Sequence, residues 1–225
     1  MEDILPLKEY HDIIKVSHSN TTQPTTTYGH LFHQDTERCS AETCSGDVGW
    51  TDSRFAHIME LRQNSLDLAR FSLADFYLSL DADVFLTDPA ALTNLVEKKL
   101  MVVAPLLSSI GLYSNFWAGM SESFYYERRE EYKTILNRKK VGCYQVPMVH
   151  TAVLVDLREE ESDLLTFLPE NIESYPGPRD DIIVFALSAT LESLPLYVCN
   201  DRYYGTLTLP LEDGQDLQHD KEVLR

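Results

Sequence analysis

Several features are scarce in this sequence of 225 residues. No apolar run approaches the roughly 20 residues that a membrane-spanning helix needs. Lysine and arginine number 19 against 36 acidic residues, which gives a formal net charge of −17. Nucleic acids and anionic membranes are bound by basic surfaces, so this charge argues against both as partners. Residues 1–6 have neither the basic start nor the apolar stretch of a signal peptide, and we expect none here.

Cysteine is also rare, with four residues in the chain. Cys39 and Cys44 lie in a polar stretch, where a disulfide and a pair of free thiols are both compatible with the sequence. Cys143 and Cys199 lie in or beside strand-like sequence, and their state stays open. The spacing does not resemble the closely paired ligands of a zinc site. The cysteines alone therefore leave the cellular compartment undecided.

The most informative stretch joins a short apolar run to two carboxylates. Residues 76–80 are mostly apolar and aromatic, which predicts a buried strand. Asp81 and Asp83 follow it, and side chains two positions apart in an extended chain point the same way. Open α/β sheets bind ligands at such strand ends, and two converging carboxylates suit Mg²⁺ or Mn²⁺. The competing interpretation is structural, because Asp is common in turns.

Hydrophobic periodicity predicts helices and strands in alternation around this stretch. We expect helices over residues 51–73 and 88–98, each opened by a Thr or Asp cap. A strand over 100–105 follows the second helix. The order strand, helix, strand predicts a crossover connection that pairs this strand in parallel with the one over 76–80.

The second half of the chain continues the same pattern. One long strand is expected over 146–156, and an acidic, helix-like segment follows over 159–167. An apolar helix begins after Asp180, and a last short strand covers 196–200. We divide the chain into three parts: an N-terminal helix and polar loop over 1–49, an α/β core over 50–210 and an acidic tail over 211–225.

Five further residues are candidates for a functional site, and each has a structural alternative. Asp180 and Asp181 either cap the following helix or supply a base for an acceptor hydroxyl. Asn115 and Trp117 lie in an aromatic-rich block that suits either core packing or carbohydrate binding. We include His150 among the substrate-binding candidates, although an interior histidine satisfied by its neighbours is the alternative.

From Trp50 onward, the order of motifs resembles glycosyltransferase family 25, which includes the procollagen galactosyltransferases. About three quarters of the chain takes part in one collinear order of motifs. The matching stretches are Trp50–Phe55, Met59–Gln63, Ala74–Asp83, Val102–Pro105, Tyr113–Trp117, Tyr125–Tyr126, Gly142–Cys143, Val146–His150, Asp180–Ala186, Tyr197–Asn200 and Tyr204–Gly205.

The resemblance implies a GT-A-like, Rossmann-like α/β sheet with flanking helices. It implies UDP-galactose as donor, Mn²⁺ as cofactor, hydroxylysine of collagen as acceptor, and the endoplasmic reticulum lumen as compartment. The family forms a β-linkage from an α-linked donor, so inversion with a carboxylate base is implied. By position, Asp81 and Asp83 would hold the metal ion, Asp180 or Asp181 would be the base, and Asn115 and Trp117 would lie near the sugar or acceptor.

The sequence also departs from the family pattern. The N-terminal strands that bind the nucleotide, and a second transferase domain, are not recognisable, and Ala118 stands where the family has cysteine. We therefore expect a truncated form of such an enzyme. The alternative is a non-catalytic relative, a secretory-pathway or adhesion module that keeps the fold without turnover. A Ca²⁺-binding protein is a weaker possibility, because the chain lacks an oxygen-rich loop with the required glycine.

Overall fold

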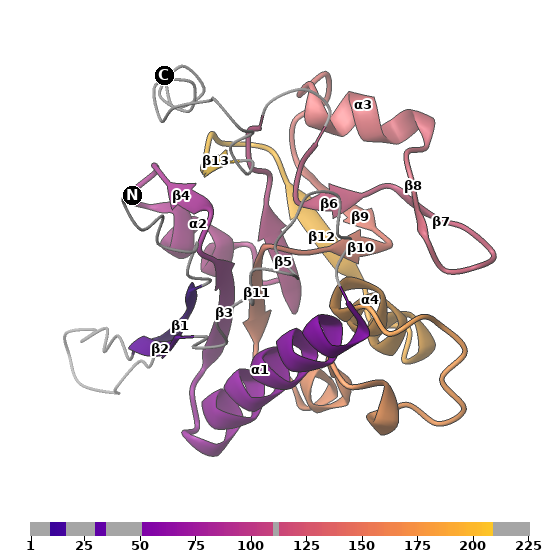
Figure 1. Cartoon of the computed structure of the whole chain (residues 1–225). Coiled ribbons are helices and arrows are strands. Elements are labelled where there is room, and N and C mark those ends of the chain that lie inside the picture. The colour runs from indigo at the N-terminus through magenta and orange to yellow at the C-terminus, as the bar shows by residue number, and fades with distance from the viewer. Residues whose placement is uncertain (1–9, 17–29, 35–50, 110–112, 209–225) are drawn as a thin grey trace, which may run out of the picture.

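The computed structural model describes residues 10–16, 30–34, 51–109 and 113–208 (Figure 1). For the first two ranges it gives the course of the backbone. The expected acidic tail over 211–225 and the Cys39–Cys44 pair lie outside the described residues.

A seven-stranded sheet forms the centre of the molecule. Neighbouring strands run antiparallel except for one parallel pair, β5 with β12. In spatial order the strands are β2 (His30–Gln34), β1 (Tyr10–Val16), β3 (Phe76–Asp81), β11 (Ala152–Asp156), β5 (Val102–Pro105), β12 (Leu196–Cys199) and β9 (Cys143–Val146).

Three short strand pairs lie outside this sheet, and each is antiparallel. The pairs are β4 (Val84–Leu86) with β13 (Gly205–Leu207), β6 (Phe116–Trp117) with β10 (Met148–Val149), and β7 (Gly119–Met120) with β8 (Tyr126–Glu127).

Helices and 3₁₀ turns connect the strands. The structure has α1 (Asp52–Phe71), α2 (Ala91–Glu97), α3 (Glu130–Leu136), α4 (Asp181–Leu191), η1 (Glu160–Leu164) and η2 (Pro169–Asn171). The expected helix over 51–73 is confirmed as α1, whose first turn is capped because Thr51 Oγ1 accepts a hydrogen bond from the Arg54 N–H. The helix expected after Asp180 is confirmed as α4. The helix expected over 88–98 is present as the shorter α2, but its N-cap is Ala90 in place of the expected Asp88, and no side chain caps its first turn.

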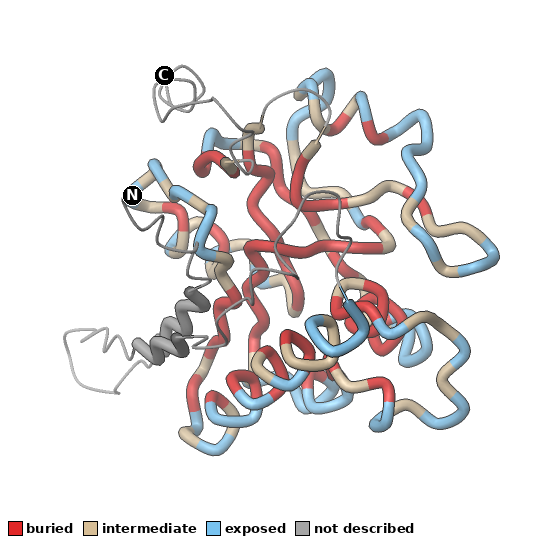
Figure 2. Tube along the Cα trace, in the orientation of Figure 1, coloured by how far each residue is buried: buried red, intermediate tan, exposed pale blue. Residues whose placement is uncertain are grey.

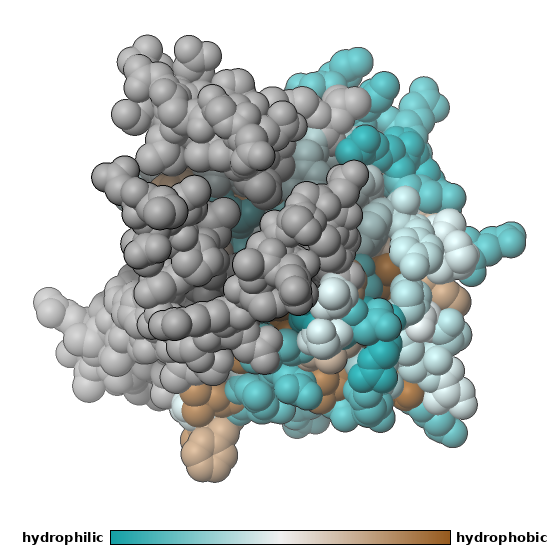
Figure 3. All heavy atoms as spheres, viewed as in Figure 1, coloured by the Kyte–Doolittle hydropathy of each residue, from teal (hydrophilic) through white to brown (hydrophobic). Residues whose placement is uncertain are grey.

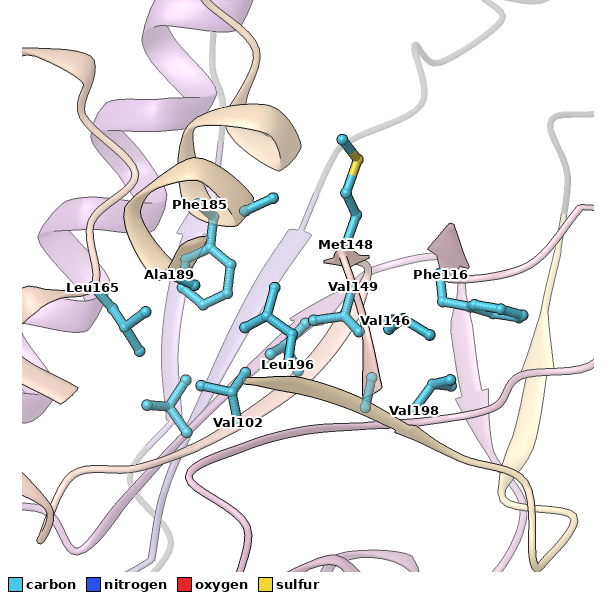
Figure 4. Close-up of a cluster of buried hydrophobic side chains, with 14 of the residues drawn as sticks. Val102, Phe116, Val146, Met148, Val149, Leu165, Phe185, Ala189, Leu196 and Val198 are labelled. Carbon is cyan, nitrogen blue, oxygen red and sulfur yellow. The ribbon is translucent and has the colours of Figure 1, made fainter. Parts of the chain in front are cut away.

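The two faces of the sheet are covered by different helices. On one face, Leu66 of α1 and Ile183 of α4 share a hydrophobic cluster with Tyr77 of β3. On the other face, Leu95 of α2 packs in a cluster with Leu78, the next residue along β3. Strand side chains alternate between faces, which explains the split. Figure 2 shows the buried strands in the middle, and Figure 4 shows the packing of the larger cluster.

The surface of the described residues in Figure 3 is mostly hydrophilic, with smaller hydrophobic areas. Phe71 and Leu73, at the connection from α1 to β3, are 86% and 88% exposed. A small number of exposed apolar side chains is ordinary on a protein surface. Among the described residues, no helix is both long enough and apolar enough to cross a membrane.

The predicted crossover pairing is wrong. β3 and β5 are not neighbours, because β11 lies between them and pairs antiparallel with both. The connection through α2 therefore passes over one strand of the sheet, β11, before the chain enters β5. Strand order of this kind depends on a partner far along the chain, and the local helix–strand pattern carries no information about it.

Two expected elements have a different form. Residues 10–16, within the expected N-terminal helix, form a strand that pairs with β3, so the sheet extends beyond the expected core over 50–210. This strand covers a long edge of β3 that would otherwise be unpaired. The helix-like segment over 159–167 contains a single 3₁₀ helix, η1, in place of an α-helix.

The long strand expected over 146–156 is divided into β9, β10 and β11. Pro147 separates the first two, because proline has no N–H to donate to a strand ladder. Thr151 separates β10 from β11 with a φ of 68°.

A disulfide joins Cys143 to Cys199 across the antiparallel pair β9–β12. The two residues are direct partners in the strand register, which brings their sulfur atoms within bonding distance. Asp201 lies beside the two sulfur atoms, but a disulfide offers no thiolate to a metal ion, and the Asp201 carboxylate pairs with the Lys98 ammonium. The bond fixes β9 at the edge of the sheet.

Candidate active site

The Asp81–Asp83 pair lies where β3 ends. Asp81 is the last residue of β3, and its N–H donates to the Thr151 carbonyl at 2.8 Å. Asp83 lies in the turn that follows, so the two side chains leave a strand end and a turn and not one continuous strand. The Asp81 side chain is 23% exposed, and Asp83 is exposed. Both carboxylates therefore lie where solvent and a ligand can approach.

The pairing of β4 with β13 holds the turn that carries Asp83. The Asp83 carbonyl accepts hydrogen bonds from the N–H of Thr208 at 3.0 Å and from its hydroxyl at 3.2 Å. Gly205 makes the close approach of the strands possible, because a Cβ atom there would lie 2.2 Å from the Phe85 carbonyl oxygen. The end of the described chain thus fixes the backbone beside Asp83.

Arg62 of α1 connects Asp81 to a second carboxylate, Asp181. Its Nη2 donates to Asp81 Oδ1 at 2.8 Å, and its Nη1 donates to Ser79 Oγ at 3.0 Å. Its Nε lies 2.8 Å from Asp181 Oδ2, a contact that is an ion pair and not an aligned hydrogen bond. Burial alone would lower the pKa of Arg62, but the charges of Asp81 and Asp181 raise it above its ordinary value.

The two aspartates at the start of α4 have different surroundings. Asp180 is the N-cap: its Oδ1 accepts from the N–H groups of Ile182 and Ile183 at 3.0 and 3.1 Å. Its Oδ2 accepts from the Tyr126 hydroxyl at 2.7 Å. Asp181 points toward Arg62. Burial raises the pKa of Asp181, the Arg62 charge opposes this, and Asp180 adds to it, so the net direction is upward.

A strained turn lies behind Asp81. The Ala152 N–H donates to the His150 carbonyl at 2.7 Å, which makes residues 150–152 a γ-turn of the rare positive-φ type around Thr151. A β-branched residue with this φ is a real outlier, and such strain is concentrated at functional sites. The same Thr151 carbonyl accepts from Asp81, so the turn and the Asp81 backbone are joined directly.

His150 lies inside the protein behind the site and is not on its surface. It is 6% exposed, and its Nδ1 is 2.7 Å from the Thr151 hydroxyl. Its Nε2 has no hydrogen-bond partner among the described residues. A cavity with room for about one water molecule is lined by His150, Arg62 and Asp181. Burial lowers the pKa of His150 to about 4, so the imidazole is neutral.

Asn115 is fully engaged with the protein backbone. Its amide nitrogen donates to the Pro105 carbonyl at 2.8 Å, and its amide oxygen accepts from the Leu107 N–H at 3.0 Å. Its own carbonyl accepts from the His150 N–H at 3.0 Å. The side chain is completely buried. Asn115 therefore holds the chain after β5 against the His150 turn.

Trp117 belongs to an aromatic stack beside Asp180. Its ring stacks on Tyr126 with centroids 5.0 Å apart and on Tyr132 at 5.9 Å. The Arg128 guanidinium lies over the same indole, 5.0 Å from its centroid. Through the Tyr126 hydroxyl, this stack connects to the start of α4.

The phenol of Tyr113 lies within the electrostatic influence of three carboxylates of the site. Burial raises the pKa of its phenol to about 12, and the negative charges of Asp83, Asp81 and Asp181 act in the same direction. Its ring centroid is 6.1 Å from that of His150. The structure thus gathers Asp81, Asp83, Asp181 and Tyr113 into one region.

Sequence reasoning did not assign a role to Arg62, Tyr113 or Tyr126. For Arg62 a signal existed: it falls on the helical stripe formed by Ile58, Met59, Leu66 and Ala69, all of which are buried. A charged residue on a core-facing stripe needs a buried partner. Tyr113 and Tyr126 carry no comparable signal, because tyrosine is ordinary in both cores and binding sites.

The donor set of Asp81 and Asp83 fits a divalent cation. Both are hard oxygen ligands, and they lie at a position open to solvent. Among the described residues they are not grouped with a third histidine, cysteine or carboxylate. Mg²⁺ in phosphate-transfer sites is commonly held by one or two carboxylates, with phosphate and water oxygens completing the shell. Two protein ligands are therefore sufficient for such a site.

The sequence matches a family model described as glycosyltransferase family 25, N-terminal domain, over residues 12–225. A glycosyltransferase 25 family member from Anopheles gambiae is 46% identical over 186 residues, which cover 82% of this chain and 31% of the relative. A second, from Aedes aegypti, is 48% identical over 177 residues, or 78% of this chain and 29% of the relative.

Procollagen galactosyltransferase 2 from Homo sapiens is 46% identical over 179 residues, which cover 80% of this chain and 28% of that protein. The aligned part is thus about three tenths of the length of these relatives. The family resemblance expected from the motifs, and the GT-A-like α/β class that it implies, are confirmed. This chain belongs to glycosyltransferase family 25.

Proposed function

We propose that this chain forms the metal-and-acceptor part of a galactosyltransferase. The reaction is transfer of galactose from UDP-galactose to hydroxylysine of collagen, with inversion at the anomeric carbon. Support comes from relatives that are named procollagen galactosyltransferases, among them the human and mouse proteins. Because the aligned part is a fraction of those relatives, the activity of this chain by itself is part of the proposal.

One observation carries the proposal: Asp81 and Asp181, which are 100 positions apart in the numbering, contact the same Arg62 guanidinium. The first ends β3 and the second begins α4. The carboxylate proposed to hold the metal ion and the carboxylate proposed to act as the base therefore lie side by side. Displacement of a diphosphate by a hydroxyl requires these two functions at adjacent places.

Asp81 and Asp83 are the residues that would hold Mn²⁺. Bound there, the ion would neutralise charge on the departing diphosphate. The protein's own contribution is to hold the two carboxylates: Thr151 fixes the Asp81 backbone, and Thr208 fixes the Asp83 carbonyl. The neighbouring Tyr113 stays a neutral phenol that can donate a hydrogen bond, since its pKa is raised to about 12.

Asp181 is a better candidate for the base than Asp180. Both Asp180 oxygens already accept hydrogen bonds, two from the α4 backbone and one from Tyr126. Asp181 has a pKa raised by burial, and a general base works best when its pKa lies nearer the working pH. In this proposal Asp181 takes the proton of the hydroxylysine hydroxyl as its oxygen attacks the anomeric carbon in line with the leaving UDP.

The aromatic stack of Trp117 and Tyr126 is the candidate surface for the sugar or the acceptor. Aromatic faces with a few polar groups suit carbohydrate ligands. Asn115 and His150 contribute indirectly in this proposal, because their hydrogen bonds hold the loop and the turn behind the site.

The Cys143–Cys199 disulfide supports an oxidising compartment, as expected of an enzyme in the endoplasmic reticulum lumen. Structural disulfides persist in the secretory pathway and are rare in the cytosol.

A transfer assay tests the proposal. The chain is incubated with UDP-galactose, Mn²⁺ and a hydroxylysine-containing collagen peptide, and the galactosylated peptide is measured by mass spectrometry. We expect transfer by the wild-type chain and its loss in Asp81→Asn and Asp83→Asn. Asp88→Asn is the matched control, because Asp88 lies in the same segment and accepts a bond from the Ala90 N–H at the start of α2.

A folded wild-type chain that transfers nothing, while a full-length relative transfers under the same conditions, would contradict the proposal. That result would favour the non-catalytic alternative for this polypeptide. Transfer that persists in Asp81→Asn and Asp83→Asn would contradict the metal assignment.

A further inference from the structure

Arg62 is an arginine in a position that the helix pattern reserves for apolar residues. Its neighbours on the core-facing stripe of α1, Ile58, Met59 and Leu66, are at most 2% exposed. The Arg62 side chain itself is 10% exposed. A buried guanidinium adds little net stability compared with an apolar side chain of similar volume. The role of Arg62 therefore lies in the groups that its guanidinium contacts.

The guanidinium is shared between two carboxylates on one edge. Nε and Nη2 form the edge that commonly receives both oxygens of a single carboxylate. Here Nη2 is 2.8 Å from Asp81 and Nε is 2.8 Å from Asp181, so each carboxylate presents one oxygen to the arginine. The rotation of both carboxylates is thereby tied to a single planar group.

The opposite side of the guanidinium is also fixed. Nη1 donates to Ser79 Oγ, which lies two residues before Asp81 on the same face of β3. The Arg62 carbonyl accepts from the Ser65 hydroxyl at 2.7 Å, and that hydroxyl is 2.8 Å from the buried Tyr77 hydroxyl. α1, β3 and α4 are thus joined at one side chain.

We propose that Arg62 is a positioning residue that sets the relative placement of Asp81 and Asp181. It holds the Asp81 carboxylate in the orientation that receives the cation, and it fixes where the Asp181 carboxylate lies relative to Asp81. This inference rests on the proposed function, because it assigns to Arg62 the geometry between the metal ligand and the base. Positioning groups one shell behind a metal ligand typically change metal affinity or activity by about 10- to 100-fold when removed.

Two substitutions at Arg62 test the inference. Arg62→Met removes the charge and the three polar contacts, to Asp81, Asp181 and Ser79, at similar side-chain length. Arg62→Lys keeps a charge but has one nitrogen in place of the fork. Mn²⁺ affinity is measured without turnover, from the electron paramagnetic resonance signal of free Mn²⁺. We expect roughly 10- to 100-fold weaker binding in Arg62→Met and an intermediate value in Arg62→Lys.

Arg70 provides the matched control on the same helix. It is partly buried, 3.3 Å from Asp67, and donates to the carbonyls of Ser162 and Leu165 at 2.6 and 3.0 Å, away from the site. Arg70→Met and Arg70→Lys should lower the melting temperature without changing Mn²⁺ affinity. A purely structural role for Arg62 predicts the same behaviour for both arginines.

A double substitution separates positioning from general damage. If Arg62 acts through Asp81, then Arg62→Met should weaken Mn²⁺ binding no further in an Asp81→Asn background, because contacting residues are not additive. At saturating Mn²⁺, Arg62→Met should still lower kcat, since Asp181 also loses its partner, whereas KM for UDP-galactose should change less.

The outcomes are distinct. Equal Mn²⁺ affinity and equal kcat in wild type and Arg62→Met overturn the inference and leave the proposed function standing. Additive effects of Arg62→Met and Asp81→Asn also overturn it. A folded wild-type chain that binds no Mn²⁺ overturns both the inference and the metal site on which the proposed function rests.

Discussion

At the residue scale, the two adjacent carboxylates of α4 are the clearest case of one sequence signal with two structural roles. Asp180 caps the helix and accepts from Tyr126, while Asp181 turns inward to Arg62. We predict that Asp181→Asn lowers kcat by about 10²- to 10⁴-fold, the usual contribution of a general base. Asp180→Asn should retain most activity, because asparagine is an equally good N-cap.

The measurement is kcat under saturating donor and Mn²⁺, with the melting temperature of each variant as a check on folding. A larger loss of kcat in Asp180→Asn than in Asp181→Asn would reverse the assignment of the base.

His150 gives a prediction for stability against pH. Its pKa is lowered by burial to about 4 in the folded protein, against about 6.5 in an unfolded chain. Between these values the unfolded state binds more protons, so the free energy of unfolding falls as pH falls from about 6.5 to about 4. The lowered pKa corresponds to a loss of about 3 kcal/mol when the window has been crossed.

Chemical denaturation at several pH values measures this effect. His150→Asn, whose amide can keep the bond to Thr151, should unfold with a smaller loss of stability over the same window. Identical pH dependence in the wild type and this variant would show that His150 is not the group responsible.

At the scale of elements, the β4–β13 pair is predicted to support the metal site. A Cβ at Gly205 would meet the Phe85 carbonyl oxygen at 2.2 Å and the Leu86 Cα at 2.9 Å, both backbone atoms that cannot move independently. We predict that Gly205→Ala costs about 1–3 kcal/mol, as overpacking usually does, and weakens Mn²⁺ binding by shifting the Asp83 turn.

Denaturation and Mn²⁺ titration of the same sample test this prediction. Ala118→Gly, in the turn between β6 and β7, is a control for small-residue exchange away from β4. Unchanged stability and Mn²⁺ affinity in Gly205→Ala would mean that the pair does not hold the turn.

The elements also show where local sequence is sufficient. α1 and α4 follow from helical periodicity and from the caps Thr51 and Asp180, which act within a few residues. The order of strands does not follow, because the insertion of β11 between β3 and β5 is decided by contacts distant in sequence. The sequence likewise does not indicate the break at Thr151. A β-branched residue favours extended backbone, and its positive φ comes from the surrounding structure.

The residues of the candidate site likewise fall into those that local sequence indicates and those that depend on how the elements pack. Asp81, Asp83, Asp180 and Asp181 were recognisable as candidates because carboxylates at strand and helix ends carry a local pattern. The bridge made by Arg62 required knowledge of how α1 packs against β3 and α4. The aromatic residues beside Asn115 in the sequence suggest a ligand-binding role for it. In the structure, its side-chain amide instead makes hydrogen bonds to the backbone of Pro105 and Leu107.

At the scale of the whole molecule, the net charge of −17 favours a basic acceptor. Surface charges are screened beyond about 10 Å at 0.1 M salt. We predict that KM for a lysine-rich collagen peptide rises severalfold between roughly 50 and 300 mM NaCl. A peptide with the same hydroxylysine but no other basic residue should show a weaker salt dependence. Equal salt dependence for both peptides would remove charge complementarity from the account.

The central claim is that Asp81 and Asp83 hold a divalent cation together with the nucleotide diphosphate. Calorimetric titration of UDP into the chain, with and without Mn²⁺, tests it most directly, using the wild type and the Asp81→Asn/Asp83→Asn variant. The account predicts binding by the wild type that requires Mn²⁺ and is abolished in the variant. UDP binding by the wild type that is independent of Mn²⁺, or that survives in the variant, would contradict it.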